Sequence, residues 1–187
     1  HVRRLGCSLL DSLPCDDASF DLVSAFETLE HLEPGTIPIA LAELRRITRR
    51  FLVATIPSFG PNEHGPDGWL DGKVLPSRIE HYRSLGPDYE GPVPFEDLER
   101  DEEGNPVEGH LTIASFSWWT RRFQEAGFER CPEMESKIHE ELARFGLTGF
   151  FDPYVLIVPG ATVPGDSLRT PDELAKAERR FKLLEIS

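Results

Sequence analysis

The chain has 187 residues, of which 39% are hydrophobic and 28% are charged, a composition typical of one globular domain with its own core. Its net charge of -13 would repel a phosphate backbone, which argues against nucleic acid as a partner. No apolar run approaches the roughly 18 residues of a membrane span, and the three cysteines are scattered. We therefore expect a cytoplasmic protein with neither a membrane anchor nor a disulfide framework.

The first predicted elements form a strand-helix-strand unit. Residues 21–26, DLVSAF, are short and apolar and follow the turn-like CDDAS, which predicts a strand. A helix is predicted over residues 36–48 because its apolar residues make one stripe: Ile37, Leu41, Leu44 and Ile47. Residues 51–56, FLVATI, are apolar on both faces, as in the covered strands of a parallel sheet. The basic cluster at the helix end is interpreted as a complement to the helix dipole: Arg45, Arg46, Arg49 and Arg50.

Residues 58–109 form a long segment in which the hydrophobic periodicity weakens and glycine, proline and acidic residues dominate. One short helix is predicted over residues 76–84. A segment of this length inside a compact domain is typically a lid, a binding loop or a disordered insertion. Aromatic side chains such as Trp69, Tyr82 and Phe95 favour packing, so a lid is the preferred interpretation.

Regular structure is predicted to resume after this insertion. A helix should begin at Ser115 or Ser117, since either side chain can cap it, and should end at Gly127. Strands are predicted over residues 128–137 and 154–158 and can pair as an antiparallel ribbon. A last amphipathic helix is expected from residue 170, with an apolar stripe of Leu174, Ala177, Phe181 and Leu184. The predicted fold class is α/β, with a mostly parallel sheet that carries a C-terminal antiparallel strand pair.

A candidate site lies where the first predicted strand ends. In an open α/β sheet, ligands bind beyond the carboxyl ends of the strands. This rule places four polar residues in or beside such a crevice: Glu27, Thr28, Glu30 and His31. The alternative is that Glu30 and His31 only begin the next segment and face solvent. His64 and His81 lie too far from other ligand-type residues to suggest a metal, and no metal site is predicted.

Three segments resemble class I S-adenosylmethionine-dependent methyltransferases. LPCDDASFDLVSAFETLEHL, residues 13–32, resembles the strand-four region, where Leu-Pro, an acidic turn, Phe-Asp, an apolar strand and Glu-His-Leu follow in order. AELRRITRRFLVATIPS resembles the next helix and strand, and GHLTIASFSWWTRRFQEAGFER resembles the late helix. The resemblance implies a partial Rossmann-like methyltransferase sheet from strand three onward, in a domain over residues 1–160 with 58–110 as insertion or lid. Residues 161–187 are then a linker and the C-terminal helix.

The resemblance also implies S-adenosylmethionine as cofactor. In the family, a glycine-rich turn after strand one holds the methionine part, and a polar residue after strand three meets the adenine. Here Ser8 and Leu9 correspond to the adenine end, and Phe26, Glu27 and Thr28 to the methionine end. No GxGxG motif occurs in the sequence. We therefore expect the chain to be an incomplete fragment, inactive alone, or else a degenerate domain that has lost the cofactor or is completed by another chain.

Two functions follow from this resemblance. The first is methyl transfer to a small molecule, such as a sugar or another hydroxylated metabolite, for which a hydroxyl or amine acceptor can need a base. His31 is the leading candidate for that base by its position, and His110 is the second. The structural alternatives are a helix-start hydrogen bond for His31 and loop packing for His110. The second function is a non-catalytic interaction module; a homodimer or a larger parent chain stays open as its setting.

Overall fold

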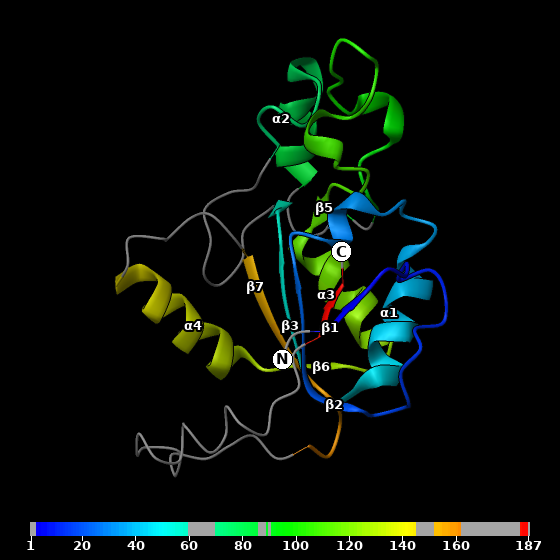
Figure 1. Ribbon diagram of the computed structural model, residues 1–187. Helices are drawn as coiled ribbons and strands as arrows, with labels where there is room; N and C mark the ends of the chain where they lie inside the picture. The colour runs from blue at the N-terminus through cyan, green and yellow to red at the C-terminus, as the bar shows by residue number, and fades with distance from the viewer. Residues whose placement is uncertain are drawn as a thin grey trace.

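The computed structural model describes residues 3–59, 70–85, 89, 91–144, 152–161 and 184–186 (Figure 1). The main sheet has the strand order β2-β3-β7-β6, with bounds Phe20–Phe26, Thr48–Ile56, Asp152–Ile157 and Glu129–Arg130. Helices α1 (Ile37–Ile47) and α3 (Phe116–Glu125) lie on one side of it, and α4 (Pro132–Arg144) lies on the other (Figure 1). Within these residues, no helix combines the length and apolar character that a membrane span needs.

The unit β2-α1-β3 forms as the sequence predicts. β2 and β3 pair in parallel, with Val23 opposite Leu52 and Ala25 opposite Ala54. α1 buries one stripe at helical spacing, formed by Ile37, Ala40, Leu41, Leu44 and Ile47. This stripe belongs to the main hydrophobic core together with Leu52 and Ala54. A helix of this length is marginal in water by itself, so its burial against the sheet stabilises it.

The predicted fold class is wrong in one respect, since the main sheet is not mostly parallel. Among the described strands of this sheet, only β2 and β3 pair in parallel; β7 pairs antiparallel with β3 on one side and with β6 on the other. The register with β3 places Ala54 opposite Tyr154 and Leu52 opposite Leu156. The apolar pattern of FLVATI signals burial on both faces, but it does not encode the direction of the neighbouring strand. A long antiparallel partner satisfies the same pattern.

Two further predictions near the C-terminus are wrong. Residues 128–137 do not form one strand, because β6 is limited to Glu129–Arg130 and α4 begins at Pro132. Proline cannot donate into a strand ladder but suits the first turn of a helix, so it ends the pairing there. Leu184, predicted on a helix, lies in β8 (Leu184–Ile186), which pairs in parallel with β1 (Arg3–Leu5). The rest of that predicted helix lies outside the described residues.

The described part of the insertion packs around a second hydrophobic core. It contains α2 (Pro76–Leu85), which confirms the predicted helix, and the short turns η3 (Phe95–Asp97) and η4 (Val107–Gly109). Its core consists of Phe59, Leu70, Val74, Ile79, Tyr82, Val93, Leu98 and Ile113. The buried Tyr82 hydroxyl donates to the Asp97 carboxylate at 2.6 Å. The described part of the insertion is thus packed around its own core, and its action as a lid stays a prediction.

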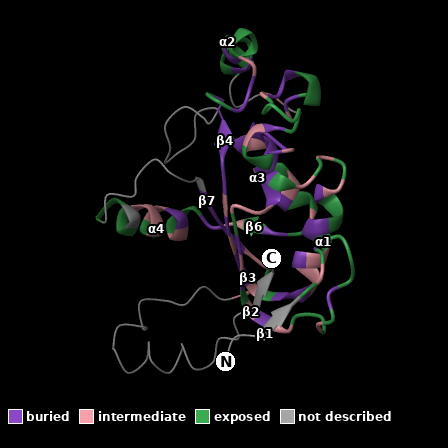
Figure 2. Cartoon of the chain, turned by 45° about the horizontal axis from the view of Figure 1, so that its top comes forward, coloured by how far each residue is buried: buried purple, intermediate pink, exposed green. Residues whose placement is uncertain are grey.

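Both ends of the insertion are fixed beside the carboxyl end of β3. β4 (Ser58–Phe59) pairs in parallel with β5 (Ala114–Ser115), and the insertion extends beyond this point at the top of Figure 1. Buried residues run along β3, β4 and the inner face of α3 (Figure 2). Ser115 caps α3, as one of the two predictions had it, by accepting the Trp118 N–H at 3.1 Å. Gly127 follows the helix with φ of +85°, which confirms its predicted role.

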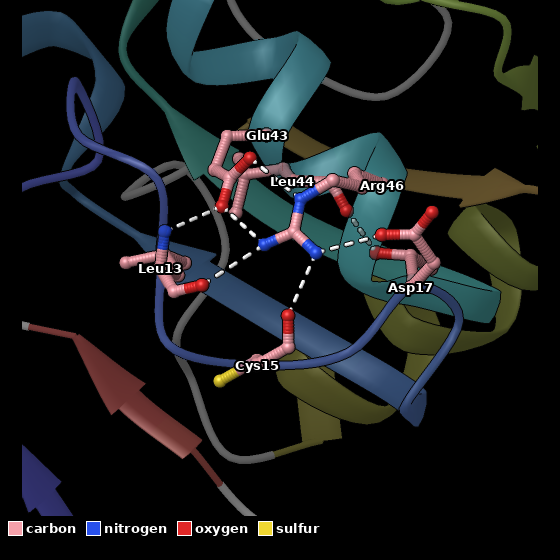
Figure 3. Close-up of polar contacts among 7 residues, drawn as sticks. Leu13, Cys15, Asp17, Glu43, Leu44 and Arg46 are labelled. Carbon is pink, nitrogen blue, oxygen red and sulfur yellow. Dashed lines mark hydrogen bonds and ion pairs between the residues drawn. The ribbon is translucent and has the colours of Figure 1, made fainter.

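Figure 3 shows how α1 holds the loop that leads into β2. The Arg46 guanidinium donates to the carbonyls of Leu13 at 3.1 Å and Cys15 at 2.7 Å, and to the carboxylates of Asp17 at 2.8 Å and Glu43 at 2.6 Å. Glu43 also accepts the Leu13 N–H at 2.6 Å. We call these five residues the Arg46 clamp. Arg46 therefore fixes a loop by directed hydrogen bonds, beyond the dipole role predicted for the basic cluster.

Candidate functional site

An open pocket of about 680 Å³ lies at the carboxyl end of β2. It brings together five of the residues that the sequence singled out, namely Ser8, Leu9, Glu27, Thr28 and His31. The other lining residues are Gly6, Cys7, Asp11 and Leu32. Phe26, the remaining cofactor candidate, is 57% exposed and is not among the lining residues. The segment before β2 and the turn after it therefore share one cavity.

Glu27 is the first residue after β2 and has an unusual backbone. Its φ of 46° lies in the left-handed region, where a residue with a side chain is strained. Its N–H bonds to the Thr55 carbonyl at 3.0 Å, which holds it against the end of β3. The side chain is half-buried, and its Oε1 has no hydrogen-bond partner among the described residues. Burial raises the pKa of this carboxyl above its ordinary value.

Glu30 lies in the turn η1 (Leu29–His31) and is fully buried, with 0% of its surface exposed. Neither of its carboxylate oxygens has a hydrogen-bond partner within the described part of the chain. Burial raises its pKa from about 4.5 to about 8, and the neighbouring Glu27 carboxylate adds to this effect. In the absence of a cation, this carboxyl is therefore protonated near neutral pH.

The segment after η4 is bonded directly to η1. The N–H groups of Leu111 and Thr112 both donate to the Glu30 carbonyl at 2.9 Å, and the Thr112 hydroxyl donates to the Leu32 carbonyl at 2.6 Å. Before them, Glu108 and Gly109 both have left-handed backbones, with φ of 58° and 71°. His110 lies between this tight turn and these hydrogen bonds, and they hold it next to His31.

The two histidines that the sequence proposed as bases are in contact. Their ring centroids lie 4.9 Å apart, with an interplanar angle of 69°. His31 is exposed and lines the pocket, and its Nδ1–H donates to the Gly109 carbonyl at 3.1 Å. His110 is only 7% exposed, and burial together with the nearby His31 lowers its pKa to about 4. His110 is therefore neutral at physiological pH, and the two rings are not equivalent.

Sequence reasoning missed the ion pair that borders this pair of histidines. Lys73, which is 9% exposed, extends from the insertion, and its Nζ lies 2.9 Å from Oε2 of Glu108. The same carboxylate oxygen lies 3.9 Å from Nδ1 of His110. The Glu108-Gly109 sequence signals a turn, but nothing in the local pattern around Lys73 points to this partner. The sequence offers two alternatives for Glu30, a place in a binding site or a position that faces solvent. The structure shows that Glu30 is buried.

Comparison with protein families gives one match, in which residues 3–51 fit the model of a methyltransferase domain. This match includes the strand-four segment on which the resemblance was stated. It confirms the resemblance to class I S-adenosylmethionine-dependent methyltransferases. No curated protein matches the chain.

The chain is also distantly similar to solved structures. One similar structure is the complex between the Haloferax volcanii Trm112 methyltransferase activator and a protein described as a methyltransferase. The matching chain is 16% identical, with a TM-score of 0.40, and the match covers 83% of the present chain. An S-adenosylmethionine-dependent methyltransferase from Methanosarcina mazei is 19% identical, with a TM-score of 0.43 and coverage of 80%. The chain spans only 60% and 62% of these two proteins. Likenesses this distant carry no argument about the site.

Proposed function

We propose that the pocket at the end of β2 binds S-adenosylmethionine and that the protein transfers its methyl group to a small hydroxylated or amine-bearing molecule. One observation carries this proposal. Every described residue that lines the pocket lies between Gly6 and Leu32, inside the segment that matches the methyltransferase domain. The cavity also occurs where open α/β sheets bind ligands, beyond the carboxyl end of a parallel strand.

The residues of the pocket fit part of such a cofactor, since the glycine-rich turn that holds the methionine part in the family is not among them. Its volume of about 680 Å³ lies within the range of small-molecule sites. The carboxylate of Glu27, which lines the pocket, would accept a hydrogen bond from the ammonium of the methionine part. Leu9, which is buried, and Ser8 would lie at the adenine end. When bound, the cofactor supplies a methyl group already activated by its sulfonium sulfur, so the protein mainly positions the acceptor.

His31 is the proposed proton acceptor for a hydroxyl or amine. Because its Nδ1–H donates to the Gly109 carbonyl, the lone pair of the ring resides on Nε2. The ring is exposed at the pocket, where an acceptor can reach it. His110 is proposed as a positioning residue, since it is buried against His31 and stays neutral.

Isothermal titration calorimetry of the full-length protein with S-adenosylmethionine tests the binding part of the proposal. We expect one site per chain in the wild type and about tenfold weaker binding in Glu27→Gln, since the charge-assisted hydrogen bond to the ammonium is lost. Glu33→Gln is the matched control, because Glu33 is exposed and does not line the pocket. The absence of both heat and thermal stabilisation in the wild type would defeat the proposal and favour the non-catalytic interaction module.

A further inference from the structure

We propose that Glu30, His31 and His110 form a binding site for a divalent transition-metal ion, for which Zn²⁺ is the best-suited candidate. Each of the three side chains offers one ligand atom, and these atoms all lie within 4.8 Å of one another. Glu30 and His31 come from η1, whereas His110 comes from the far end of the insertion. The metal site does not depend on the methyl transfer proposed above.

The strongest support is a set of buried acceptors that have no donor. Both carboxylate oxygens of Glu30 and Nδ1 of His110 are buried, and none of these atoms has a hydrogen-bond partner among the described residues. A buried polar atom without a partner is costly, and native proteins rarely keep several together without a ligand. A single cation at the centre of the cluster would supply the missing partner to both side chains at once.

The histidines are also prepared as ligands. The Nδ1–H of His31 is bonded to a backbone carbonyl, which fixes the ring and leaves Nε2 free to coordinate. Hydrogen bonding of the second ring nitrogen in this way is typical of metal-binding histidines. His110 is 7% exposed, and its Nδ1 has no hydrogen-bond partner among the described residues, so this nitrogen is available as a ligand atom.

The backbone around the cluster is rigid and in part strained. Two hydrogen bonds from Leu111 and Thr112 hold the carbonyl of Glu30, so the segment that carries His110 cannot move away from η1 without breaking them. Glu108, whose φ is 58°, stores strain in the turn just before His110. Such preorganisation lowers the cost of assembling three ligands around one ion.

The charges that face the cluster also favour a cation. Lys73 is the positive group that acts on Glu30 and His110, but its charge is balanced by Glu108 at 2.9 Å. Glu27, on the other side, contributes a second carboxylate close to Glu30. The two carboxylates of Glu27 and Glu30 would therefore attract a cation to the cluster.

The ligand set indicates the class of metal. Two imidazoles and one carboxylate suit Zn²⁺ and similar borderline ions better than Mg²⁺ or Ca²⁺, which prefer oxygen. Ligand bonds of about 2.0–2.2 Å require the three atoms to close in by small side-chain rotations. Three protein ligands leave a coordination position open, and one of these ligands, His31, lines the pocket. If the proposed methyl transfer holds, a metal there would lower the pKa of an acceptor hydroxyl in place of His31 as base.

Equilibrium dialysis of the chelator-treated protein against Zn²⁺ tests the site, with Co²⁺ as a spectroscopic substitute. We expect one ion per chain, a visible Co²⁺ absorption band and a higher unfolding temperature. Glu30→Gln and His110→Ala should each weaken Zn²⁺ binding more than tenfold. His81→Ala is the matched control, because His81 is an exposed histidine on α2 outside the cluster, and it should bind Zn²⁺ as the wild type does.

The result that overturns the proposal is wild-type Zn²⁺ binding by Glu30→Gln, or no stoichiometric binding by the wild type. Far-UV circular dichroism of Glu30→Gln separates loss of a ligand from loss of the fold, and the amide should leave the fold intact because it preserves the shape of the side chain. Glu27→Gln should weaken Zn²⁺ binding far less than Glu30→Gln does, because Glu27 is not one of the three ligands, while it loses about tenfold in affinity for S-adenosylmethionine. The failure of the metal site and the failure of the proposed function are therefore observed in separate titrations.

Discussion

The two ends of β2 are flanked by polar networks of opposite character. Before the strand, the Arg46 clamp joins α1 to the loop at Leu13–Cys15, and the guanidinium donates to both backbone carbonyls and to two carboxylates (Figure 3). After the strand, Glu30 and His110 are more deeply buried, yet they keep acceptor atoms without partners among the described residues. Both networks join segments that are distant in the sequence.

This difference distinguishes the Arg46 clamp, which maintains the fold, from Glu30 and His110, which we propose bind a metal ion. A network whose donors and acceptors are matched contributes stability and specifies a single loop conformation. A network of buried acceptors without donors lowers stability unless a proton or an ion completes it. Left-handed backbones occur in both regions, at Ala18 in the first and at Glu27 and Glu108 in the second, so strain does not distinguish the two networks. The comparison therefore predicts that replacing a charged side chain by an uncharged one changes the free energy of unfolding in opposite directions in the two networks.

The largest expected effect comes from Glu30→Gln, measured in metal-free buffer. Burial raises the Glu30 pKa from about 4.5 in the unfolded chain to about 8, so the stability it contributes is fully present below about pH 4.5 and is lost as the pH rises toward 8. Glutamine cannot ionise and escapes this loss. The variant should become more stable than the wild type by roughly 3 kcal/mol at about pH 8.5, as measured by urea unfolding. Parallel pH profiles of the two proteins would contradict the assignment.

Arg46→Ala should have the opposite sign and a slightly smaller size. The substitution leaves the carbonyls of Leu13 and Cys15 and the Glu43 carboxylate without their charged donor. We expect the free energy of unfolding to fall by about 2 to 3 kcal/mol in a urea titration. Arg49→Ala is the control, because Arg49 is exposed and pairs only with Asp21 among the described residues, and it should cost much less. Equal losses in both variants would show that the clamp is no more than a surface ion pair.

His110→Gln should give the smallest effect and should act at low pH. Burial lowers the His110 pKa from about 6.5 to about 4, so its contribution is fully present above about pH 6.5 and is lost as the pH falls toward 4. The variant should show less of this acid destabilisation, by about 1 to 2 kcal/mol relative to the wild type. Unfolding temperatures at several pH values measure it, with the exposed His81→Gln as control. The same acid response in both variants would argue that His110 is accessible to solvent.

The sequence alone determined the elements whose buried residues form a regular apolar pattern, either a stripe along a helix or a continuous run in a strand. The helical spacing of apolar residues fixed α1, the apolar run fixed β3, and the Ser115 cap and Gly127 bounded α3. The same kind of reading placed Glu27, Thr28 and His31 at the carboxyl end of β2, where the pocket lies. These features depend on neighbours in the chain, which a sequence displays directly.

Only the tertiary structure decided how these elements face one another. Strand direction within the sheet is set by which strand packs beside β3, and the apolar content of FLVATI is the same for either direction. The contact between His31 and His110 depends on backbone hydrogen bonds from Leu111 and Thr112 to Glu30, across the whole insertion. Backbone groups are identical in every residue, so the sequence carries no sign of those bonds. The burial of Glu30, and with it the proposed metal site, follows from them.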